Sequence, residues 1–233
     1  MTGNHTEIVP RLAAARARIL EVASACGRDP NRIRLVAVSK TQGVDAVRTA
    51  AGAGQRDFGE NQLQEALPKI ADTADLDLTW HFIGPIQSNK TRGIAEHFAW
   101  VHSVDRLKVA ERLSQQRPRE LPPLQVCIQI NTSHEASKSG VRPDAALALA
   151  RAVNRLPRLR LRGIMAVPAP AADVAGQLEA CLEVRAVYEQ LRMAGLELDT
   201  LSLGMSADLE AAVQAGSSLL RIGTDIFGAR PSP

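Results

Sequence analysis

Aromatic residues are scarce in this chain of 233 residues, where Phe, Trp and Tyr make up only 3% of the composition. No basic run is interleaved with them, and 28 Lys and Arg residues stand against 25 Asp and Glu residues, giving a formal charge of +3. Proteins that bind nucleic acids commonly combine clustered positive charge with aromatic side chains on which bases stack. The composition therefore gives no support for a nucleic-acid partner.

Long hydrophobic runs are also missing. No stretch approaches the roughly 18 uninterrupted apolar residues of a membrane span. Residues 1–10 contain no apolar segment of the kind found in a secretory signal. We therefore expect a cytoplasmic protein that has no membrane partner.

Cysteine residues are too few and too far apart in the sequence to stabilise the fold by disulfide bonds. Cys26, Cys127 and Cys181 are odd in number and far apart in the sequence, which argues against both a disulfide framework and a closely spaced pair of metal ligands. The five histidines show no ligand spacing either, so structural or surface roles are expected for them. We predict no metal site and three buried thiols.

Short apolar runs alternate with amphipathic segments along the whole chain, as expected where strands buried on both faces alternate with helices. Eight strands are predicted, over residues 33–40, 57–59, 79–84, 100–103, 124–131, 161–167, 200–203 and 219–222. Helices are predicted between them, over residues 44–53, 63–70, 88–97, 105–113, 143–153, 172–194 and 207–215.

This alternation, in a chain close to the roughly 250 residues typical of the fold, predicts a single-domain (β/α)₈ barrel of the TIM type over residues 1–233. A doubly wound open sheet is the alternative. An extra N-terminal helix is predicted over residues 8–22, where apolar residues recur on one helical face and Gly27 can end it. Few residues follow the eighth strand, so we expect this extra helix to occupy the place of a full eighth helix.

Two charged residues are placed where a parallel barrel collects its functional groups, at the C-terminal ends of the strands. Lys40 ends the first strand, where an amine can become nucleophilic toward an aldehyde. A solvated lysine finishing a strand is the alternative. Arg221 lies inside the eighth strand, and an arginine that points into the barrel needs a partner because burying an unpaired charge is costly. If Arg221 points toward the helices instead, this functional interpretation fails.

A phosphate site is predicted after strands seven and eight, where barrels of this type often bind phosphate. Ser206 is placed at the N-cap of the helix over residues 207–215, so that its hydroxyl and the free N–H groups face an anion. Gly223 permits close backbone approach, and Thr224 adds a second hydroxyl. An ordinary cap and turn are the alternative. From these residues alone, a cofactor-free barrel enzyme acting on a sugar phosphate stays open.

Seven short motifs, taken together and in this order, resemble the pyridoxal phosphate homeostasis protein family. They are Val36-Ala-Val-Ser-Lys40, Phe58-Gly-Glu-Asn61, His81-Phe-Ile-Gly-Pro85, Ser137-Lys-Ser-Gly140, Leu203-Gly-Met-Ser206, Arg221-Ile-Gly-Thr224 and Ile226-Phe-Gly-Ala-Arg230. The resemblance runs almost from end to end of the chain. The fold of that family resembles the barrel domain of bacterial alanine racemase, without the second domain of that enzyme.

The resemblance implies pyridoxal 5′-phosphate as the cofactor, held as an internal aldimine on Lys40 and exchanged reversibly without net turnover. It implies further positions around the cofactor: Arg221 facing the pyridine nitrogen, Asn61 near the ring, and Ser206, Gly223 and Thr224 at the phosphate.

Two further lysine positions bear on how the cofactor is transferred. Lys138 matches a family lysine, and the resemblance implies that it is a secondary acceptor for the cofactor. A merely solvated role is the alternative. Gln42 departs from the family pattern, because a second lysine is expected there in many relatives. Transfer that depends on that lysine must use another route in this chain.

The resemblance also bears on whether the protein carries the cofactor or catalyses a reaction with it. An arginine at the pyridine nitrogen favours the neutral ring and a weaker electron sink than an acidic partner gives. The likeness to alanine racemase implies that racemisation needs a tyrosine base from the absent second domain. The single tyrosine, Tyr188, lies in a helix expected to face away from the barrel mouth. We therefore expect a monomeric carrier that buffers the cofactor or delivers it to apoenzymes, with no catalytic residue; an amino-acid racemase of low activity is the alternative.

Overall fold

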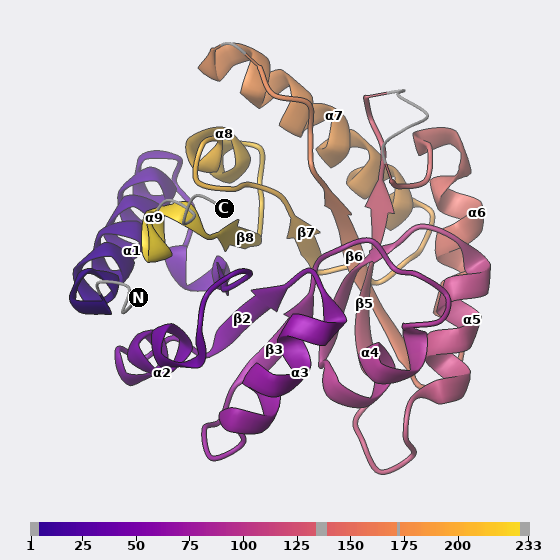
Figure 1. Cartoon of the computed structure of the whole chain (residues 1–233). Coiled ribbons are helices and arrows are strands. Elements are labelled where there is room, and N and C mark those ends of the chain that lie inside the picture. Colours follow the sequence, from indigo (N-terminus) through magenta and orange to yellow (C-terminus); the bar gives the residue numbers. More distant parts are fainter. Residues whose placement is uncertain (1–4, 134–138, 172, 229–233) are drawn as a thin grey trace.

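Eight parallel strands form the centre of the molecule. The structure, a computed structural model, describes residues 5–133, 139–171 and 173–228. The strands close into a barrel in the order β1 to β8, and the closing pair is β8 with β1, where Arg221 lies beside Val36. The helices surround this barrel (Figure 1). The predicted closed (β/α)₈ barrel is confirmed, and the doubly wound open sheet is excluded.

The elements follow the predicted order along the chain. The strands are β1 Arg34–Val38, β2 Asp57–Glu60, β3 Thr79–Phe82, β4 Trp100–Val104, β5 Leu124–Ile130, β6 Leu159–Ala166, β7 Thr200–Ser202 and β8 Leu219–Ile222. The helices are α1 Ile8–Ala25, α2 Val44–Gly52, α3 Leu63–Asp72, α4 Thr91–His97, α5 Leu107–Gln116, α6 Pro143–Asn154, α7 Val174–Met193, α8 Leu209–Gln214 and α9 Thr224–Phe227. Across the described ranges, none of these helices combines the length and apolarity needed to cross a bilayer.

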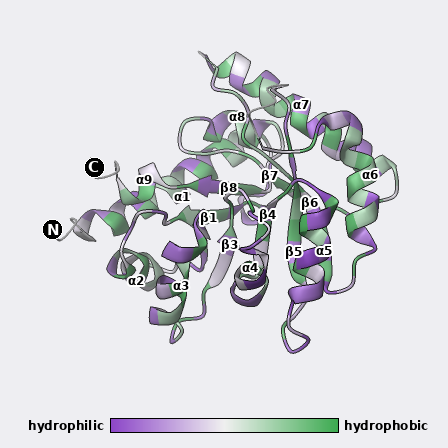
Figure 2. Cartoon of the chain, turned by 45° about the vertical axis from the view of Figure 1, so that its right-hand side comes forward, coloured by the Kyte–Doolittle hydropathy of each residue, from purple (hydrophilic) through white to green (hydrophobic). Residues whose placement is uncertain are grey.

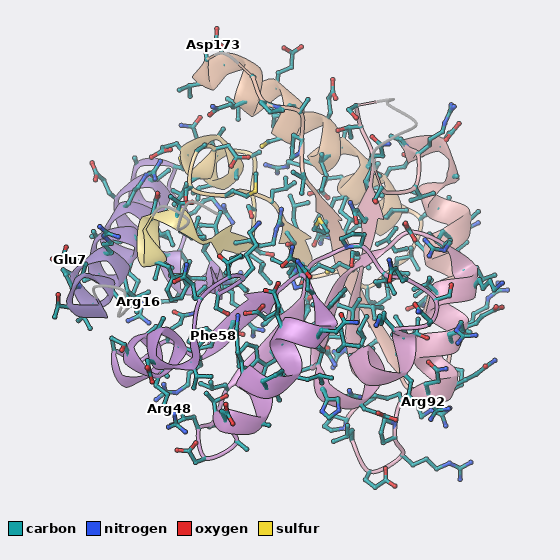
Figure 3. The ribbon with its side chains drawn as sticks, viewed as in Figure 1. Glu7, Arg16, Arg48, Phe58, Arg92 and Asp173 are labelled. Atoms are coloured by element: carbon teal, nitrogen blue, oxygen red, sulfur yellow. The ribbon has the colours of Figure 1, made fainter. Side chains whose placement is uncertain are left out.

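The main hydrophobic core lies between the strands and the surrounding helices. Strand residues such as Phe58 and Val101 pack there with residues of the helices. Because successive side chains of a strand point to opposite faces, the intervening positions face the barrel interior. Trp100, Cys127 and Met165 form a separate small cluster at such positions. Figure 2 shows the hydrophobic colour along strands such as β5 and β6, and Figure 3 shows charged side chains such as Arg48 on the outside of the helices.

The extra helix α1 covers the seam where the barrel closes. It contacts α2, α8 and the single-turn α9, which stands in place of a full eighth helix. Figure 1 shows α1 beside α8 and α9. Its apolar stripe is buried in these contacts, at Ile8, Leu12, Ala15, Ile19 and Ala23. The expected place of the N-terminal helix is therefore confirmed.

One cysteine differs from the sequence-based expectation. Cys26 is exposed, because it lies at the C-cap of α1, just beyond the end of the apolar stripe. Cys127 and Cys181 are buried as predicted, and burial raises the pKa of the first thiol to about 12 and of the second to about 11. Both are protonated at neutral pH and behave as apolar packing groups.

Candidate functional site

A cavity of about 460 Å³ opens at the C-terminal end of the barrel. This volume lies within the range of about 300–1,000 Å³ that is usual for small-molecule sites. The lining includes all six residues predicted around the cofactor: Lys40, Asn61, Ser206, Arg221, Gly223 and Thr224. Although they are spread over most of the sequence, the parallel strands end at the same side of the barrel and bring them together.

Arg221 points into the barrel, and its side chain supplies a positive charge to the cavity wall. The residue is only 4% exposed. Its Nη1 donates to the carbonyl oxygen of Ser202 at 2.7 Å and to Ser202 Oγ at 2.6 Å, while Nη2 donates to the carbonyl oxygen of Ala166 at 2.9 Å. Burial lowers the pKa of Arg221 to about 10, so the guanidinium stays protonated at neutral pH. The inward orientation required by the functional interpretation is present.

Lys40 occupies a tight turn directly after β1. The turn is closed by Gln42 N, which donates to the Ser39 carbonyl oxygen at 3.0 Å. Thr41 has a φ of 66°, in the left-handed region that β-branched residues seldom adopt. Strain of this kind persists only where the surrounding structure holds it, and it is frequent at ligand sites. Lys40, Thr41 and Gln42 all line the cavity.

A buried ion pair that was not predicted holds this turn from below. Lys69 Nζ, from α3, donates to Glu60 Oε1 at 2.8 Å and to the Ser39 carbonyl oxygen at 2.8 Å. Ser39 Oγ donates to the same Glu60 oxygen at 2.6 Å. Burial raises the pKa of Glu60, while the hydrogen bonds from Lys69 and Ser39 oppose that rise. Because Ser39 precedes Lys40 and Glu60 precedes Asn61, this cluster fixes the backbone at two of the cavity residues.

A close backbone approach fixes the position of Asn61. A Cβ atom added to Gly84 would lie 2.2 Å from the Asn61 carbonyl oxygen, a distance that real Cβ atoms essentially never show. Only glycine therefore lets the segment after β3 pass over Asn61. Gly84 and Asn61 both line the cavity, which explains the glycine in the motif His81-Phe-Ile-Gly-Pro85.

Ser206 does not cap α8, contrary to the prediction. The helix begins at Leu209 with Asp208 at the N-cap, because Asp208 Oδ1 accepts a hydrogen bond from Met205 N at 2.7 Å and holds residues 205–208 in a turn. Ser206 Oγ instead accepts from Asp225 N at 3.3 Å. The hydroxyl of Ser206 thus joins the loop after β7 to α9, beside Gly223 and Thr224.

Arg18 on α1 clamps the same two segments from outside. Its guanidinium donates to both carboxylate oxygens of Glu210 at 2.5 and 2.6 Å, to Asp225 Oδ2 at 2.9 Å and to the Ser206 carbonyl oxygen at 3.0 Å. The hydrogen bond to Glu210 raises the pKa of Arg18. From the sequence, Arg18 was evident only as a residue off the apolar stripe of its helix, so this contact was not predicted.

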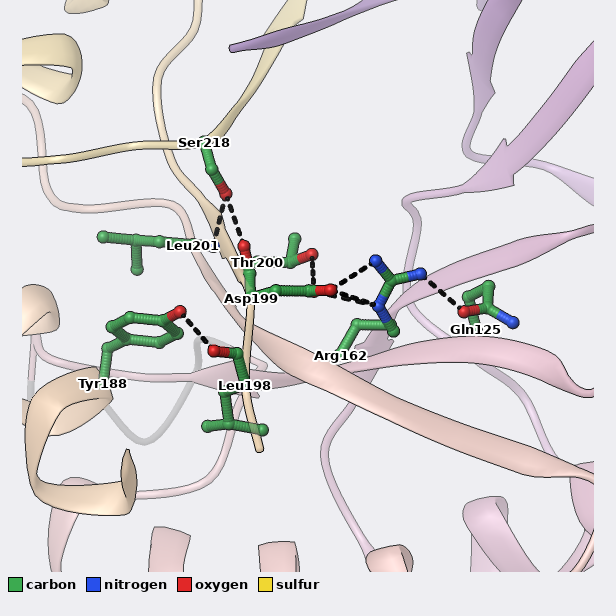
Figure 4. A network of polar contacts seen from close by, with 8 residues as sticks. All are labelled: Gln125, Arg162, Tyr188, Leu198, Asp199, Thr200, Leu201 and Ser218. Carbon is green, nitrogen blue, oxygen red and sulfur yellow. Dashed lines mark hydrogen bonds and ion pairs between the residues drawn. The ribbon is translucent and has the colours of Figure 1, made fainter. Parts of the chain in front are cut away.

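The remaining predicted positions fall elsewhere. Lys138 lies outside the described residues. Tyr188, on α7, lies at the N-terminal end of the barrel, where its hydroxyl donates to the Leu198 carbonyl oxygen at 3.0 Å (Figure 4). There it lines a second cavity of about 750 Å³, together with Trp100 and several arginines. As expected, the single tyrosine is far from the barrel mouth.

Comparison with known proteins first defines the class of barrel. A family model described as the N-terminal domain of alanine racemase matches residues 11–231. The alanine racemase of Corynebacterium glutamicum shares this fold, with a TM-score of 0.70 at 15% identity over 97% of this chain and 62% of that one.

Two curated relatives then identify the family to which this barrel belongs. The pyridoxal phosphate homeostasis protein of Pseudomonas aeruginosa is 61% identical over 223 residues, which is 96% of each chain. The protein of the same name from Escherichia coli is 52% identical over 227 residues, or 96% of this chain and 97% of that one. The chain belongs to the pyridoxal phosphate homeostasis protein family.

A solved structure agrees with this assignment. PipY of Synechococcus elongatus, whose structure is described as having PLP bound, matches with a TM-score of 0.84 at 36% identity. The match covers 95% of this chain and 100% of PipY.

Proposed function

We propose that this protein binds pyridoxal 5′-phosphate in the cavity at the C-terminal end of the barrel and buffers or delivers it, without net catalytic turnover. One observation carries the proposal: an amine, a buried protonated guanidinium and two hydroxyls converge on a cavity of small-molecule size. The names of the curated relatives and the PLP-bound structure of PipY support the choice of cofactor. The expected recipients are PLP-dependent apoenzymes.

The donor set of the cavity suits a phosphorylated pyridine aldehyde. When bound, the cofactor supplies an aldehyde carbon with which an unprotonated amine condenses and releases water. We assign Lys40 Nζ as that amine. The turn of residues 39–42, held by the Glu60–Lys69 pair, keeps Lys40 at the cavity wall. A substitution that loosens this turn is therefore expected to weaken attachment.

Arg221 is assigned to the pyridine nitrogen. Because its pKa stays near 10, the guanidinium keeps its protons and donates a hydrogen bond to the ring nitrogen without transferring a proton. A ring nitrogen held unprotonated in this way draws electrons weakly, which disfavours transamination, whereas racemisation tolerates an arginine at this position. This is the first reason for a carrier rather than a transaminase.

The phosphate is assigned to the side of the cavity formed by Ser206, Gly223 and Thr224. A Cβ atom at Gly223 would lie 3.3 Å from the Val38 carbonyl oxygen, so a side chain there would crowd the end of β1. Asn61 is assigned to the neighbourhood of the ring. These four residues bind and orient, and none of them is given a proton-transfer role.

The position of Tyr188 is the second reason for a carrier. A racemase needs bases on opposite faces of the substrate, and the single tyrosine lies at the other end of the barrel. An amino-acid racemase of low activity is the second candidate, favoured by the likeness of the barrel to alanine racemase. Enantiomer exchange of alanine at rates typical of enzymes, lost in Lys40→Ala, would favour it over the carrier.

The test of the cofactor site is the visible absorption spectrum of the protein mixed with pyridoxal 5′-phosphate, followed by borohydride reduction and peptide mass mapping. We expect one reduced adduct on Lys40, lost in Lys40→Ala and kept in Lys108→Ala, a matched exposed lysine on α5. An unshifted absorption band of the cofactor with no reduced adduct, or adducts scattered over several lysines, would contradict the proposal and restore the cofactor-free barrel enzyme.

The proposal also covers the oligomeric state, the domain organisation and the location of the protein. We propose a monomer that forms one domain over residues 1–233 and works in the cytoplasm. Light scattering behind a sizing column measures the mass, and a dimer at micromolar concentration would contradict the monomer.

A further inference from the structure

Five polar side chains form a continuous line through the barrel interior, from its N-terminal end to Arg221. Four hydrogen-bond contacts join them in the order Asp57, His81, His102, Ser202 and Arg221, and we call this set the axial network. His81, His102 and Ser202 are fully buried. Buried polar groups are costly unless they are paired, and each buried side chain of the axial network finds a partner within this network.

The contacts of the axial network are short and cross the barrel. Asp57 Oδ1 lies 2.9 Å from His81 Nε2, and His81 Nδ1 lies 3.0 Å from His102 Nε2. His102 Nδ1 lies 3.0 Å from Ser202 Oγ, to which Arg221 Nη1 donates at 2.6 Å. Because His102 is on β4 and Ser202 is on β7, which are not neighbours, this contact spans the interior.

The two imidazoles are neutral in the folded protein. Burial lowers the pKa of His81, and it lowers the pKa of His102 well below its usual value, with the nearby positive charge of Arg221 adding to the effect. A neutral imidazole has one N–H donor and one acceptor nitrogen. Each ring of the axial network therefore donates on one side and accepts on the other.

Only one direction of donation satisfies every contact. Ser202 Oγ accepts from the Arg221 guanidinium, so its own hydrogen is available for His102 Nδ1. His102 then carries its proton on Nε2 and donates to His81 Nδ1. His81 in turn carries its proton on Nε2 and donates to the Asp57 carboxylate. Donation thus runs without a break from the buried cation to the carboxylate.

The reverse direction leaves a repulsive contact. If His81 donated from Nδ1 to His102, its bare Nε2 would face Asp57 Oδ1 at 2.9 Å. Two acceptors at that distance repel each other and lose a hydrogen bond that a buried group needs. The opposite tautomers are therefore excluded for neutral rings.

The network also determines how Arg221 presents its remaining donors. A guanidinium carries five N–H donors in one plane. Three of them are used by Ser202 Oγ and by the carbonyl oxygens of Ser202 and Ala166. Three anchored donors fix the plane of the group, and the other two are left for a ligand in the cavity that Arg221 lines.

We propose that Ser202, His102 and His81 are positioning residues for the cofactor, acting through the axial network to hold the Arg221 guanidinium in the orientation that meets the pyridine ring. This inference rests on the proposed function, because it concerns the ligand assigned to that cavity. Asp57, which also lies 3.6 Å from Arg34 Nη1, accepts the last hydrogen bond at the far end of the network. Hydrogen bonds aligned in this way polarise and strengthen one another.

The first test measures binding of pyridoxal 5′-phosphate to Ser202→Ala. Removing the hydroxyl breaks the network one contact from Arg221, and we expect the dissociation constant to rise roughly tenfold, the usual effect of losing a hydrogen bond to a charged group. We expect attachment to remain on Lys40 and the pH dependence of the visible absorption of the bound cofactor to change. Ser114→Ala is the matched control, since it removes a buried hydroxyl that donates to the Pro157 carbonyl oxygen, outside the axial network.

A double-mutant cycle separates this role from general destabilisation. His81 and Ser202 do not contact each other, so purely local effects of His81→Leu and Ser202→Ala on the dissociation constant should multiply. If the residues act through one network, the double variant should deviate from that product by more than about threefold. Multiplying effects, or equal binding by Ser202→Ala and Ser114→Ala, would overturn the inference.

The second test needs no variant and no cofactor. Nitrogen chemical shifts of ¹⁵N-labelled histidine report which ring atom carries the proton, and we expect Nε2–H in both His81 and His102. An Nδ1–H tautomer or an imidazolium at neutral pH would refute the direction of donation. If the wild-type protein forms no adduct on Lys40, the proposed function is contradicted. If the adduct forms but binding is unchanged in Ser202→Ala, only the present inference is contradicted.

Discussion

The two ends of the barrel differ in how their positive charges are balanced. At the N-terminal end, a cavity of about 750 Å³ is lined by six arginines: Arg28, Arg32, Arg34, Arg162, Arg185 and Arg192. The carboxylates of the protein itself neutralise several of them, as when Arg162 donates to Asp199 at 2.5 to 3.0 Å (Figure 4). At the C-terminal end the cavity is smaller, and the hydrogen bonds of Arg221 go to uncharged oxygens.

This comparison shows that neither volume nor number of charges identifies the functional end. A guanidinium already paired with a carboxylate has little electrostatic attraction left for an anionic ligand, whereas one held by neutral acceptors keeps it. Arg221 can be buried in this way because three oxygen acceptors pair with its guanidinium, and the axial network fixes one of them, the Ser202 hydroxyl.

The largest expected effect concerns the ion pairs of the two ends. Lys69→Met leaves Glu60 buried without its partner, and we expect a loss of about 3–5 kcal/mol in the free energy of unfolding. Arg162→Met breaks a half-exposed pair at the other end and should cost less than about 1 kcal/mol. Urea denaturation measures both values. Equal losses would contradict the claim that the buried Glu60–Lys69 pair stabilises the protein more than the half-exposed Arg162–Asp199 pair does.

Arg221→Met removes the buried cation from the cavity at the C-terminal end of the barrel. We expect binding of pyridoxal 5′-phosphate to weaken by about 1.5–3 kcal/mol, which is tenfold or more in the dissociation constant. Arg192→Met breaks a pair with Glu189 in the cavity at the N-terminal end of the barrel, and it should leave binding unchanged. A titration followed by visible absorption tests this, and weakened binding in Arg192→Met would break the distinction between the ends.

The histidines that join the two ends should make stability depend on pH. Because burial lowers the pKa of His102 below its ordinary value of 6.5, the unfolded chain binds a proton that the folded protein excludes. Stability is therefore complete above about pH 6.5 and falls below it, by up to about 1.4 kcal/mol per pH unit for this residue. His102→Gln should flatten the slope between pH 6.5 and 5, while His97→Gln, at an exposed position, should keep it. An unchanged slope in His102→Gln would mean that this ring is already charged.

The smallest expected effect concerns two residues with positive φ, one at each end. Thr41→Gly should relieve about 1–2 kcal/mol of left-handed strain, partly offset by about 1 kcal/mol of added freedom in the unfolded chain, for a net gain below about 1 kcal/mol. Arg158, before β6, has a φ of 61°, but its guanidinium donates to the carbonyl oxygens of Ser114 and Gln115. Arg158→Gly should therefore destabilise the protein. Thermal unfolding of both variants shows whether the signs differ.

The sequence predicts the barrel and the convergence of its cavity residues because both depend on local order. Apolar runs alternating with helices define parallel strands, and residues such as Lys40 and Thr224 then fall at the strand ends by position alone. The N-cap assigned to Ser206 was wrong because residues 205–208 form a turn before the helix, closed by the hydrogen bond from Met205 N to Asp208 Oδ1. The helix therefore begins only at Leu209, with Asp208 at the N-cap.

The supporting contacts could not be predicted, since they join residues that only the closed barrel brings together. The axial network draws on β2, β3, β4, β7 and β8, and no spacing in the sequence connects His102 with Ser202. For Lys69 there was a signal: it lies on the stripe of α3 that also buries Leu63 and Ala66. A lysine on such a stripe calls for a buried carboxylate, and Glu60 provides it.

A crystal structure of the protein grown with pyridoxal 5′-phosphate tests the central claim most directly, because both cavities are then offered the same ligand. The account predicts continuous density from Lys40 Nζ to the cofactor, with the ring nitrogen at Arg221 and the phosphate beside Ser206 and Thr224. Density for the cofactor among the arginines at the N-terminal end, with none at Lys40, would contradict it.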